Sequence, residues 1–406
     1  MNSKGANRVT VLALYKFVSL PKSQLSTLKI QIEEKLRSVS ARGTIILAPE
    51  GINGTICYPE KNALLPSDYV TSNKSNQTTD SVIEFLNEQD YFSGIRTRIS
   101  YAETSIFHRL KVKIKTVIVT MTYEECNEQE SVDGDKHKNK QHVVKVDPTD
   151  KVGIYVKAGK EWDDLLMDPD VVVIDTRNKY EVEVGTFENA ISPNTDNFKQ
   201  FPDWLHRLAA ACKDADNKNE TTPDSTQCVI NNNLSQTSNA RSLEPVPESD
   251  MPTVKRKPKA IAMFCTGGIR CEKSTSYALE QNVFPSDVPI YHLDGGILAY
   301  LDSYPDSKSS KWKGECFVFD QRVALRHGLM PSETYASCHA CKRPLSEEDR
   351  KGVDYVEGIS CKHCKDKISE SQKERFLERQ KQMNLSHKTG IVHIHDPKEY
   401  IHRDLS

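Results

Sequence analysis

The given sequence shows no pattern typical of a secretory signal or of a membrane-spanning segment. Its first eight residues are polar and contain no apolar core of a secretory signal. The first hydrophobic stretch, 9–20, is interrupted by Lys16 and closed by Pro21, so it is too short to span a bilayer. With 55 basic and 57 acidic residues, the net charge is −2, and a nucleic-acid partner has to be argued from local patches. We expect a cytoplasmic protein without a membrane partner.

Familiar cofactor signatures are also missing. The sequence has no Gly-x-Gly-x-x-Gly segment and no His-His-carboxylate arrangement, so no flavin, haem or non-haem iron site is indicated. Only 37% of the 406 residues are hydrophobic, which favours two or three domains with polar insertions over one large core. Eleven cysteines without a secretory signal predict thiol chemistry and metal binding, not a disulfide framework.

The N-terminal region alternates strand-like and helix-like patterns. Strands are predicted at 9–18, 44–48, 55–57 and 111–121, and helices at 24–36 and from residue 80. The order strand–helix–strand–strand–helix–strand is that of a ferredoxin-like α+β fold. We assign residues 1–125 to this domain, with a polar insert at 66–79, and residues 126–148 to a polar linker.

The middle of the chain predicts a second domain, residues 149–315. Apolar strands at 171–174, 260–264 and 288–293 alternate with helical patterns at 201–212 and 297–301. Such alternation indicates a parallel sheet covered by helices on both faces. The polar segment 213–258 cannot bury enough apolar surface to offset its ordering entropy, so we expect a disordered insert. Residues 316–406 form a C-terminal extension.

Cys265 lies directly after the central strand, at the start of a glycine-rich turn into a helix. Two glycines allow backbone amides to turn inward and form a nest that stabilises a thiolate. An arginine in the loop adds a fixed positive charge, and such surroundings lower a cysteine pKa from ~8.5 toward or below neutrality. We therefore predict a nucleophilic cysteine; a buried core cysteine, the alternative, would need neither the glycines nor the arginine. The loop comprises Thr266, Gly267, Gly268, Ile269, Arg270 and Cys271.

Four residues in or near this loop have two interpretations each. Asp175 and Arg177, at another strand end, either orient the loop through charge-assisted hydrogen bonds or brace the next turn. Cys271 is either a resolving thiol for Cys265 or, as helical geometry favours, a structural residue pointing into the fold. Lys273 is unfavourable at a helix N-terminus, so it either attracts a substrate phosphate or is structural.

The C-terminal extension carries two Cys-x2-Cys pairs, Cys338 with Cys341 and Cys361 with Cys364, separated by 19 residues. This spacing suits a tetrahedral four-thiolate zinc site, which is usually closed and structural. We predict a small zinc-ribbon-like segment; the alternative is four reduced thiols without a metal.

Residues 95–115 combine basic and aromatic side chains, the combination that RNA backbone contact and base stacking require. A merely solvated face is the alternative. The candidate RNA-binding residues are Arg96, Arg98, Arg109, Lys111, Lys113 and Lys115.

The Cys265 loop resembles the active-site loop of a rhodanese domain and, more narrowly, that of the tRNA uridine hydroxylase (TrhO) family. Five further stretches resemble segments of that family: 49–54, 109–113, 175–190, 294–297 and 317–323. One departure is Pro49, where many relatives have histidine, so an imidazole role is not expected there.

The resemblance implies a rhodanese-like fold for the second domain and a function in tRNA modification. The implied reaction inserts oxygen from O2 at carbon 5 of the wobble uridine, giving 5-hydroxyuridine, with the N-terminal domain holding the anticodon arm. The alternative is a sulfurtransferase that carries a persulfide on Cys265, from a donor such as thiosulfate. A cysteine phosphatase usually has Cys-x5-Arg, whereas Cys265 and Arg270 are spaced Cys-x4-Arg. A non-catalytic scaffold would be expected to have lost the cysteine.

Overall fold

The computed structural model describes residues 9–59, 77–124, 141–143, 146–219 and 257–389. Most of the predicted inserts at 66–79 and 213–258 lies outside these ranges. The chain divides into two compact units, the first made of Met1–Thr116 with Phe317–Ser406 and the second of Val117–Cys316. The C-terminal extension thus belongs to the same unit as the N-terminal domain.

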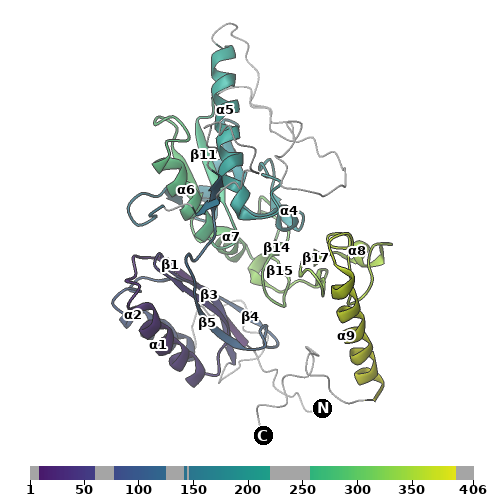
Figure 1. The fold of residues 1–406 in the computed structure, drawn as a ribbon. Coiled ribbons are helices and arrows are strands. Elements are labelled where there is room, and N and C mark those ends of the chain that lie inside the picture. Colours follow the sequence, from purple (N-terminus) through teal and green to yellow (C-terminus); the bar gives the residue numbers. More distant parts are fainter. Residues whose placement is uncertain (1–8, 60–76, 125–140, 144–145, 220–256, 390–406) are drawn as a thin grey trace, which may run out of the picture. The chain divides into compact units, whose positions relative to one another are not determined.

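The first unit contains a five-stranded sheet in the order β4-β1-β3-β2-β5 (Figure 1). Its elements are β1 (Val9–Phe17), α1 (Leu25–Ser38), β2 (Arg42–Ala48), β3 (Gly51–Pro59), α2 (Gln77–Glu88), β4 (Arg96–Ala102) and β5 (Leu110–Ile114). The first four strands pair antiparallel, as the ferredoxin-like fold requires, so the predicted fold is confirmed.

One strand of this fold differs from the sequence prediction. The fourth strand of the ferredoxin-like unit is β4, which the sequence analysis treated only as a basic segment. The strand expected at 111–121 is the shorter β5, which adds a fifth strand parallel to β2. β4 is only partly buried along most of its length and carries two arginines, so it has no apolar run to reveal it.

Helices α1 and α2 cover one face of this sheet (Figure 1). Their apolar residues, such as Ile32 and Leu86, pack against Leu12 and Ile56 of the strands. The opposite face has no helix on it among the described residues. At one end of that face, Arg322 donates a hydrogen bond of 2.7 Å to the Oγ of Ser100, so the C-terminal extension covers this end.

The second unit contains a four-stranded parallel sheet in the order β8-β12-β11-β9. A parallel sheet at this position confirms the prediction. The elements are β6 (Thr122–Glu124), β7 (Gln141–Val143), β8 (Ile154–Val156), α3 (Lys160–Leu166), β9 (Val171–Asp175), α4 (Lys179–Val182), β10 (Gly185–Phe187), η2 (Phe198–Gln200), α5 (Phe201–Asn219), β11 (Ala260–Phe264), α6 (Ile269–Glu280), β12 (Ile290–Leu293), α7 (Gly296–Ser303) and β13 (Trp312–Gly314). Because α5 runs to Asn219, the residues 213–219 that we assigned to the insert continue a helix.

Both faces of the parallel sheet are covered. On one, Ile174 and Met263 pack against Trp204 of α5 and Tyr277 of α6. On the other, aromatic rings gather around Phe187, whose centroid lies 4.9 Å from that of Phe264, 4.7 Å from Tyr300 and 5.0 Å from Trp312. Edge-to-face aromatic packing of this kind adds to the burial energy and fixes the strand ends in place.

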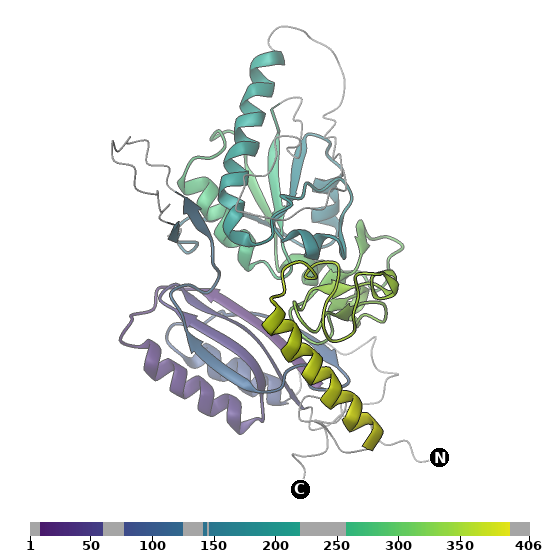
Figure 2. The same ribbon diagram turned by 45° about the vertical axis from the view of Figure 1, so that its right-hand side comes forward.

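The C-terminal extension consists of short elements followed by one long helix, α9 (Figure 2). They are β14 (Cys316–Phe317), β15 (Ala324–Leu325), η4 (His327–Leu329), β16 (Ala336–Ser337), β17 (Pro344–Leu345), α8 (Glu347–Lys351) and α9 (Glu370–Thr389). No helix in the described part of the chain has the length and hydropathy of a bilayer-spanning segment.

Candidate functional site

The sulfur of Cys265 lies at the carboxyl end of β11 and is held by the turn that follows. Its Sγ accepts a hydrogen bond of 3.1 Å from the backbone N–H of Gly268. Gly268 has a φ of 99°, a conformation that an L-residue with a side chain rarely adopts. The glycine therefore directs an amide at the sulfur, immediately before α6 begins.

The carbonyl groups of the same loop accept hydrogen bonds from helix α7. The N–H groups of Ile297 and Leu298, at the start of α7, donate to the carbonyl oxygens of Cys265 and Thr266 at 2.9 and 3.0 Å. The approach is close enough that a Cβ on Gly296 would lie 2.5 Å from the Cys265 oxygen. Anchoring the carbonyls on α7 leaves the amides of the loop to face the sulfur.

Cys265 is buried, with 1% of its surface exposed. Its sulfur nonetheless has a polar partner, the backbone amide of Gly268. The loop itself is partly exposed at Thr266 and Gly267, and a Cβ added to Gly267 would meet no atom within 4 Å. The turn above the sulfur therefore borders open space.

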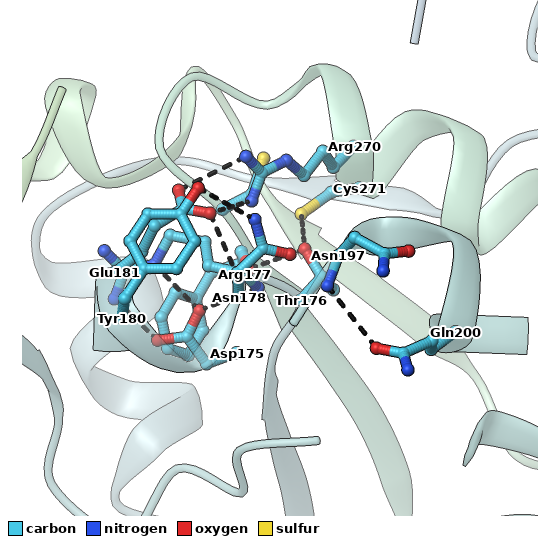
Figure 3. A network of polar contacts seen from close by, with 12 residues as sticks. Asp175, Thr176, Arg177, Asn178, Tyr180, Glu181, Asn197, Gln200, Arg270 and Cys271 are labelled. Carbon is cyan, nitrogen blue, oxygen red and sulfur yellow. Dashed lines mark hydrogen bonds and ion pairs between the residues drawn. The ribbon is translucent and has the colours of Figure 1, made fainter. Parts of the chain in front are cut away.

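Arg270 is held in place by a carboxylate that the sequence analysis did not select. Its Nη1 and Nη2 donate to Oε2 and Oε1 of Glu181 at 2.9 and 3.2 Å (Figure 3). Glu181 is fully buried in α4 and also accepts from the backbone N–H of Asn178 at 3.1 Å. The Arg270 guanidinium additionally lies 5.9 Å from the ring centroid of Phe198. Two signals in the sequence mark Glu181, the Asn-x-x-Glu capping pattern and its place in the segment 175–190 that resembles the family.

The two thiols of the loop have different proton affinities. Burial acts to raise the pKa of Cys265, but hydrogen bonding by Cys271, the charge of Arg270 and the loop amides outweigh it and lower the pKa from 9.0 to about 7. Burial raises the pKa of Cys271 well above 9.0. At pH 7 about half of the Cys265 sulfur is therefore ionised, whereas Cys271 remains a thiol.

Cys271 is fully buried in the core of the second unit. Its Sγ lies 3.8 Å from Oγ1 of Thr176 (Figure 3). The favoured sequence interpretation had this side chain pointing into the fold as a structural residue, and its full burial agrees with that interpretation. The helix starts at Ile269, which places Cys271 in its first turn.

Asp175 and Arg177 form a fully buried, bidentate ion pair with N···O distances of 2.8 and 2.6 Å. Arg177 also donates to the carbonyl of Gly185 at 2.6 Å, and Thr186 donates to Asp175 at 2.8 Å. The guanidinium lies over the ring of Trp312 at 5.2 Å. These contacts tie the end of β9 to β10, which matches the bracing interpretation of the pair.

Lys273 does not lie where a substrate phosphate would meet it. Its side chain is fully buried in α6, and its Nζ donates to the carbonyl of Val119 at 2.9 Å. The expected attraction of a phosphate is therefore replaced by a hydrogen bond between α6 and the start of the second unit.

The four cysteines of the C-terminal extension lie together. All four sulfurs lie within 4.8 Å of one another, and the individual Sγ–Sγ distances include 3.9 Å for Cys338–Cys364 and 3.7 Å for both Cys341–Cys361 and Cys361–Cys364. A tetrahedron of sulfurs around zinc, with Zn–S bonds of about 2.3 Å, has edges of about 3.8 Å. The cluster therefore has the size and donor set of a metal site such as zinc.

Four of the basic candidates share the helix-free face of the five-stranded sheet. One row of paired residues runs across all strands from Arg98 through Ala13, Thr55 and Thr44 to Lys111. The next row runs from Arg96 through Tyr15, Asn53 and Ile46 to Lys113. Arg109 and Lys115 flank β5, and both are exposed. The sequence did not indicate the polar residues in the middle of these rows, because only the pairing of the strands brings them together.

The N-terminal region that contains this sheet also matches a known protein family. Residues 9–76 match the family model of the UPF0176 acylphosphatase-like domain. The match supports, at the level of this domain, the family that the sequence resembles. A solved structure from Rhodopseudomonas palustris, described as a protein of unknown function and possible tyrosine phosphatase, is 16% identical. The similarity covers 38% of this chain and 84% of that one with a TM-score of 0.20, too low to define a shared fold.

Proposed function

We propose that this protein is a tRNA-modifying enzyme that hydroxylates carbon 5 of the wobble uridine with O2, using Cys265 as the nucleophile. The observation that carries the proposal is the loop geometry. A sulfur at a strand end accepts the Gly268 amide, and its pKa is lowered to about 7. Such a thiolate is present in quantity at neutral pH and is a strong nucleophile.

The chemistry follows from what a thiolate does to a pyrimidine ring. Addition of the Cys265 sulfur to carbon 6 of uracil converts the ring into an enolate with electron density at carbon 5. That carbon then reacts with O2 to give a hydroperoxide, and a thiol reductant cleaves its O–O bond, leaving the hydroxyl group on carbon 5 and releasing water while two thiols become a disulfide. Loss of the proton from carbon 5 expels the thiolate. To reach the sulfur, the base has to leave its stack, as in other enzymes that modify single bases.

The helix-free face of the first unit supports RNA as the partner. With strands about 4.8 Å apart, Arg98 and Lys111 lie at opposite edges of the face, about 19 Å from each other. Between these basic edges, Thr55 and Asn53 offer hydrogen-bonding groups. Cationic edges around a polar centre suit a single-stranded loop, whose phosphates and base edges are both accessible.

The pairing of Arg270 favours hydroxylation over transfer of sulfur from an anionic donor. A dianion such as thiosulfate needs uncompensated positive charge, whereas the charge of Arg270 is balanced by buried Glu181 at 2.9 Å. A phosphatase would also need uncompensated positive charge for its anionic substrate, whereas a neutral uracil ring does not need it.

The four-cysteine cluster would hold zinc as a structural ion. When bound, the ion would stabilise this segment in the way that a hydrophobic core stabilises a larger domain, because its strands β16 and β17 are only two residues long. All four protein ligands fill a tetrahedral shell, so no position is left open for substrate.

Nucleoside mass spectrometry tests the proposal. Transfer RNA lacking 5-hydroxyuridine is incubated with the purified protein in air and under argon, with a thiol reductant present. We expect 5-hydroxyuridine only in air and only with wild-type protein, whereas Cys265→Ser gives none. Unchanged uridine together with new sulfur-containing nucleosides would identify a sulfurtransferase instead.

A further inference from the structure

Phe319, in the C-terminal extension, places an aromatic ring in solvent. Its exposed fraction is 62%, whereas every other phenylalanine in the described part of the chain is buried or half-buried. A ring left in water forgoes the free energy that its burial would provide, so it is a group that a partner can cover with gain. Its surroundings indicate which partner that is.

A short hairpin holds the Phe319 ring in place. The backbone N–H of Val318 donates to the carbonyl of Val323 at 2.9 Å, and the N–H of Val323 donates to the carbonyl of Asp320 at 3.1 Å. Residues 319–322 therefore form the tip between β14 and β15 (Figure 1). The ring packs edge-to-face against buried Phe317, with 5.0 Å between the centroids. A ring fixed in this way loses little conformational entropy when a ligand covers it.

The hairpin tip is fastened to the helix-free face of the five-stranded sheet. Arg322 forms a buried ion pair with Asp320 at 2.7 Å and donates to the Oγ of Ser100 at 2.7 Å. Ser100 follows Arg98 by two positions on β4, so both project from the same face, about 7 Å apart along the strand. Three chain positions span at most about 11 Å, so Phe319 lies close to the Arg98 end of the basic rows.

A second contact brings the tip to the segment that precedes β5. The Nε2 of Gln321 lies 3.1 Å from the Nε2 of His108, which is followed directly by exposed Arg109. The acidic neighbour of Phe319, Asp320, is neutralised by its ion pair with Arg322. The exposed ring therefore stands among cationic side chains with its own acidic neighbour compensated, which suits a ligand that is both aromatic and anionic.

Building on the RNA partner of the proposed function, we propose that Phe319 is a stacking platform for one unpaired base of the RNA that binds the helix-free face. Every base has a π-face, so stacking on the ring supplies affinity without reading sequence. The phosphates on either side of that base meet the arginines that flank the hairpin. A duplex keeps its bases within its own stack, so the platform favours a single-stranded loop over a paired stem.

Fluorescence anisotropy with a labelled anticodon stem-loop RNA tests this assignment. The loop of this RNA supplies the unpaired bases, and a set of derivatives carries one abasic nucleotide each in the loop. Affinity is measured over a range of salt concentrations for the full-length wild-type protein, Phe319→Ala and Phe319→Trp. The matched control is Ile30→Ala, which removes a side chain that is 57% exposed on α1, the helix that covers the opposite face of the sheet.

We expect Phe319→Ala to bind the intact RNA about fivefold or more weakly, as when other stacked aromatic residues are truncated. The slope of log affinity against log salt stays the same, because no phosphate contact is lost. Phe319→Trp and Ile30→Ala keep the wild-type affinity. One abasic position weakens binding to the wild type by a similar factor and leaves binding to Phe319→Ala unchanged, because base and ring form a single contact.

The two proposals fail in different ways. If Phe319→Ala binds the intact RNA as tightly as the wild type, the platform is wrong and the RNA partner stands. The same conclusion follows if Phe319→Trp loses as much affinity as Phe319→Ala, or if the loss in Phe319→Ala is equal for the intact RNA and every abasic derivative. If the wild-type protein does not bind the stem-loop, the RNA partner and the platform are both overturned.

Discussion

Removing the charges beside Cys265 should make its thiol a weaker acid. The fall in the pKa of Cys265 from 9.0 to about 7 corresponds to roughly 3 kcal/mol in favour of the thiolate. Arg270 is one of the groups that produce it. Replacing Arg270 alone would leave the carboxylate of Glu181 buried and unpaired, at a cost of about 3–5 kcal/mol. The informative variant is therefore Arg270→Gln combined with Glu181→Gln, which removes both charges and keeps polar side chains of similar shape.

In this double variant we expect the pKa of Cys265 to rise by up to about one unit, because the loss of the Arg270 charge raises it and the loss of the Glu181 charge offsets part of that rise. Because the thiolate is the reactive form, alkylation by iodoacetamide at pH 7 should slow by up to about fivefold. The rate at pH 10, where Cys265 is ionised in both proteins, should stay the same. The rate is measured for Cys265 itself by tandem mass spectrometry of its peptide at each pH.

The matched control is Lys160→Gln with Asp164→Asn, which removes an ion pair of 2.6 Å whose side chains are 85% and 62% exposed. It should leave the pH profile of Cys265 unchanged. An unshifted profile in the Arg270 and Glu181 variant, with its urea midpoint near that of the wild type, would refute the electrostatic account of the loop.

Three further predictions concern other parts of the chain. Lys111→Glu with Lys113→Glu should weaken binding of single-stranded RNA and reduce the slope of log affinity against log salt by about 1.4, measured by filter binding; an unchanged slope would remove the sheet face as the interface. Cys361→Ser should abolish stoichiometric zinc measured by metal analysis, and retained zinc would show that the cluster is not the site. Asp175→Asn should lower the free energy of urea unfolding by about 3–5 kcal/mol because it leaves Arg177 charged and buried; a loss below about 1 kcal/mol would contradict the bracing role.

Local patterns predicted the elements around the site well. The apolar run 260–264 indicated a buried strand, and it is β11, the strand that carries Cys265 at its end. The two Cys-x2-Cys pairs indicated one cluster, and their sulfurs meet. In both cases the informative residues lie within a few positions of one another, so short-range conformation largely decides the outcome.

Other features were decided by contacts between distant residues. β4 is a strand because it pairs with β1, although its exposed arginines hide the apolar pattern. Lys273 is buried because the carbonyl group of Val119, 154 positions earlier, accepts a hydrogen bond from its Nζ. No local rule for helix N-termini predicts this contact.

By itself, the sequence determined where a reactive sulfur stands, at the junction of strand, glycine turn and helix, because those conformations depend on neighbouring residues. Only the tertiary structure decided what surrounds that sulfur. Glu181 reaches Arg270 across 89 positions of the chain, and Thr176 reaches Cys271 across 95. Packing of parallel strands brings such groups to one edge of a sheet, and their charges and hydrogen bonds then set the acidity of the thiol.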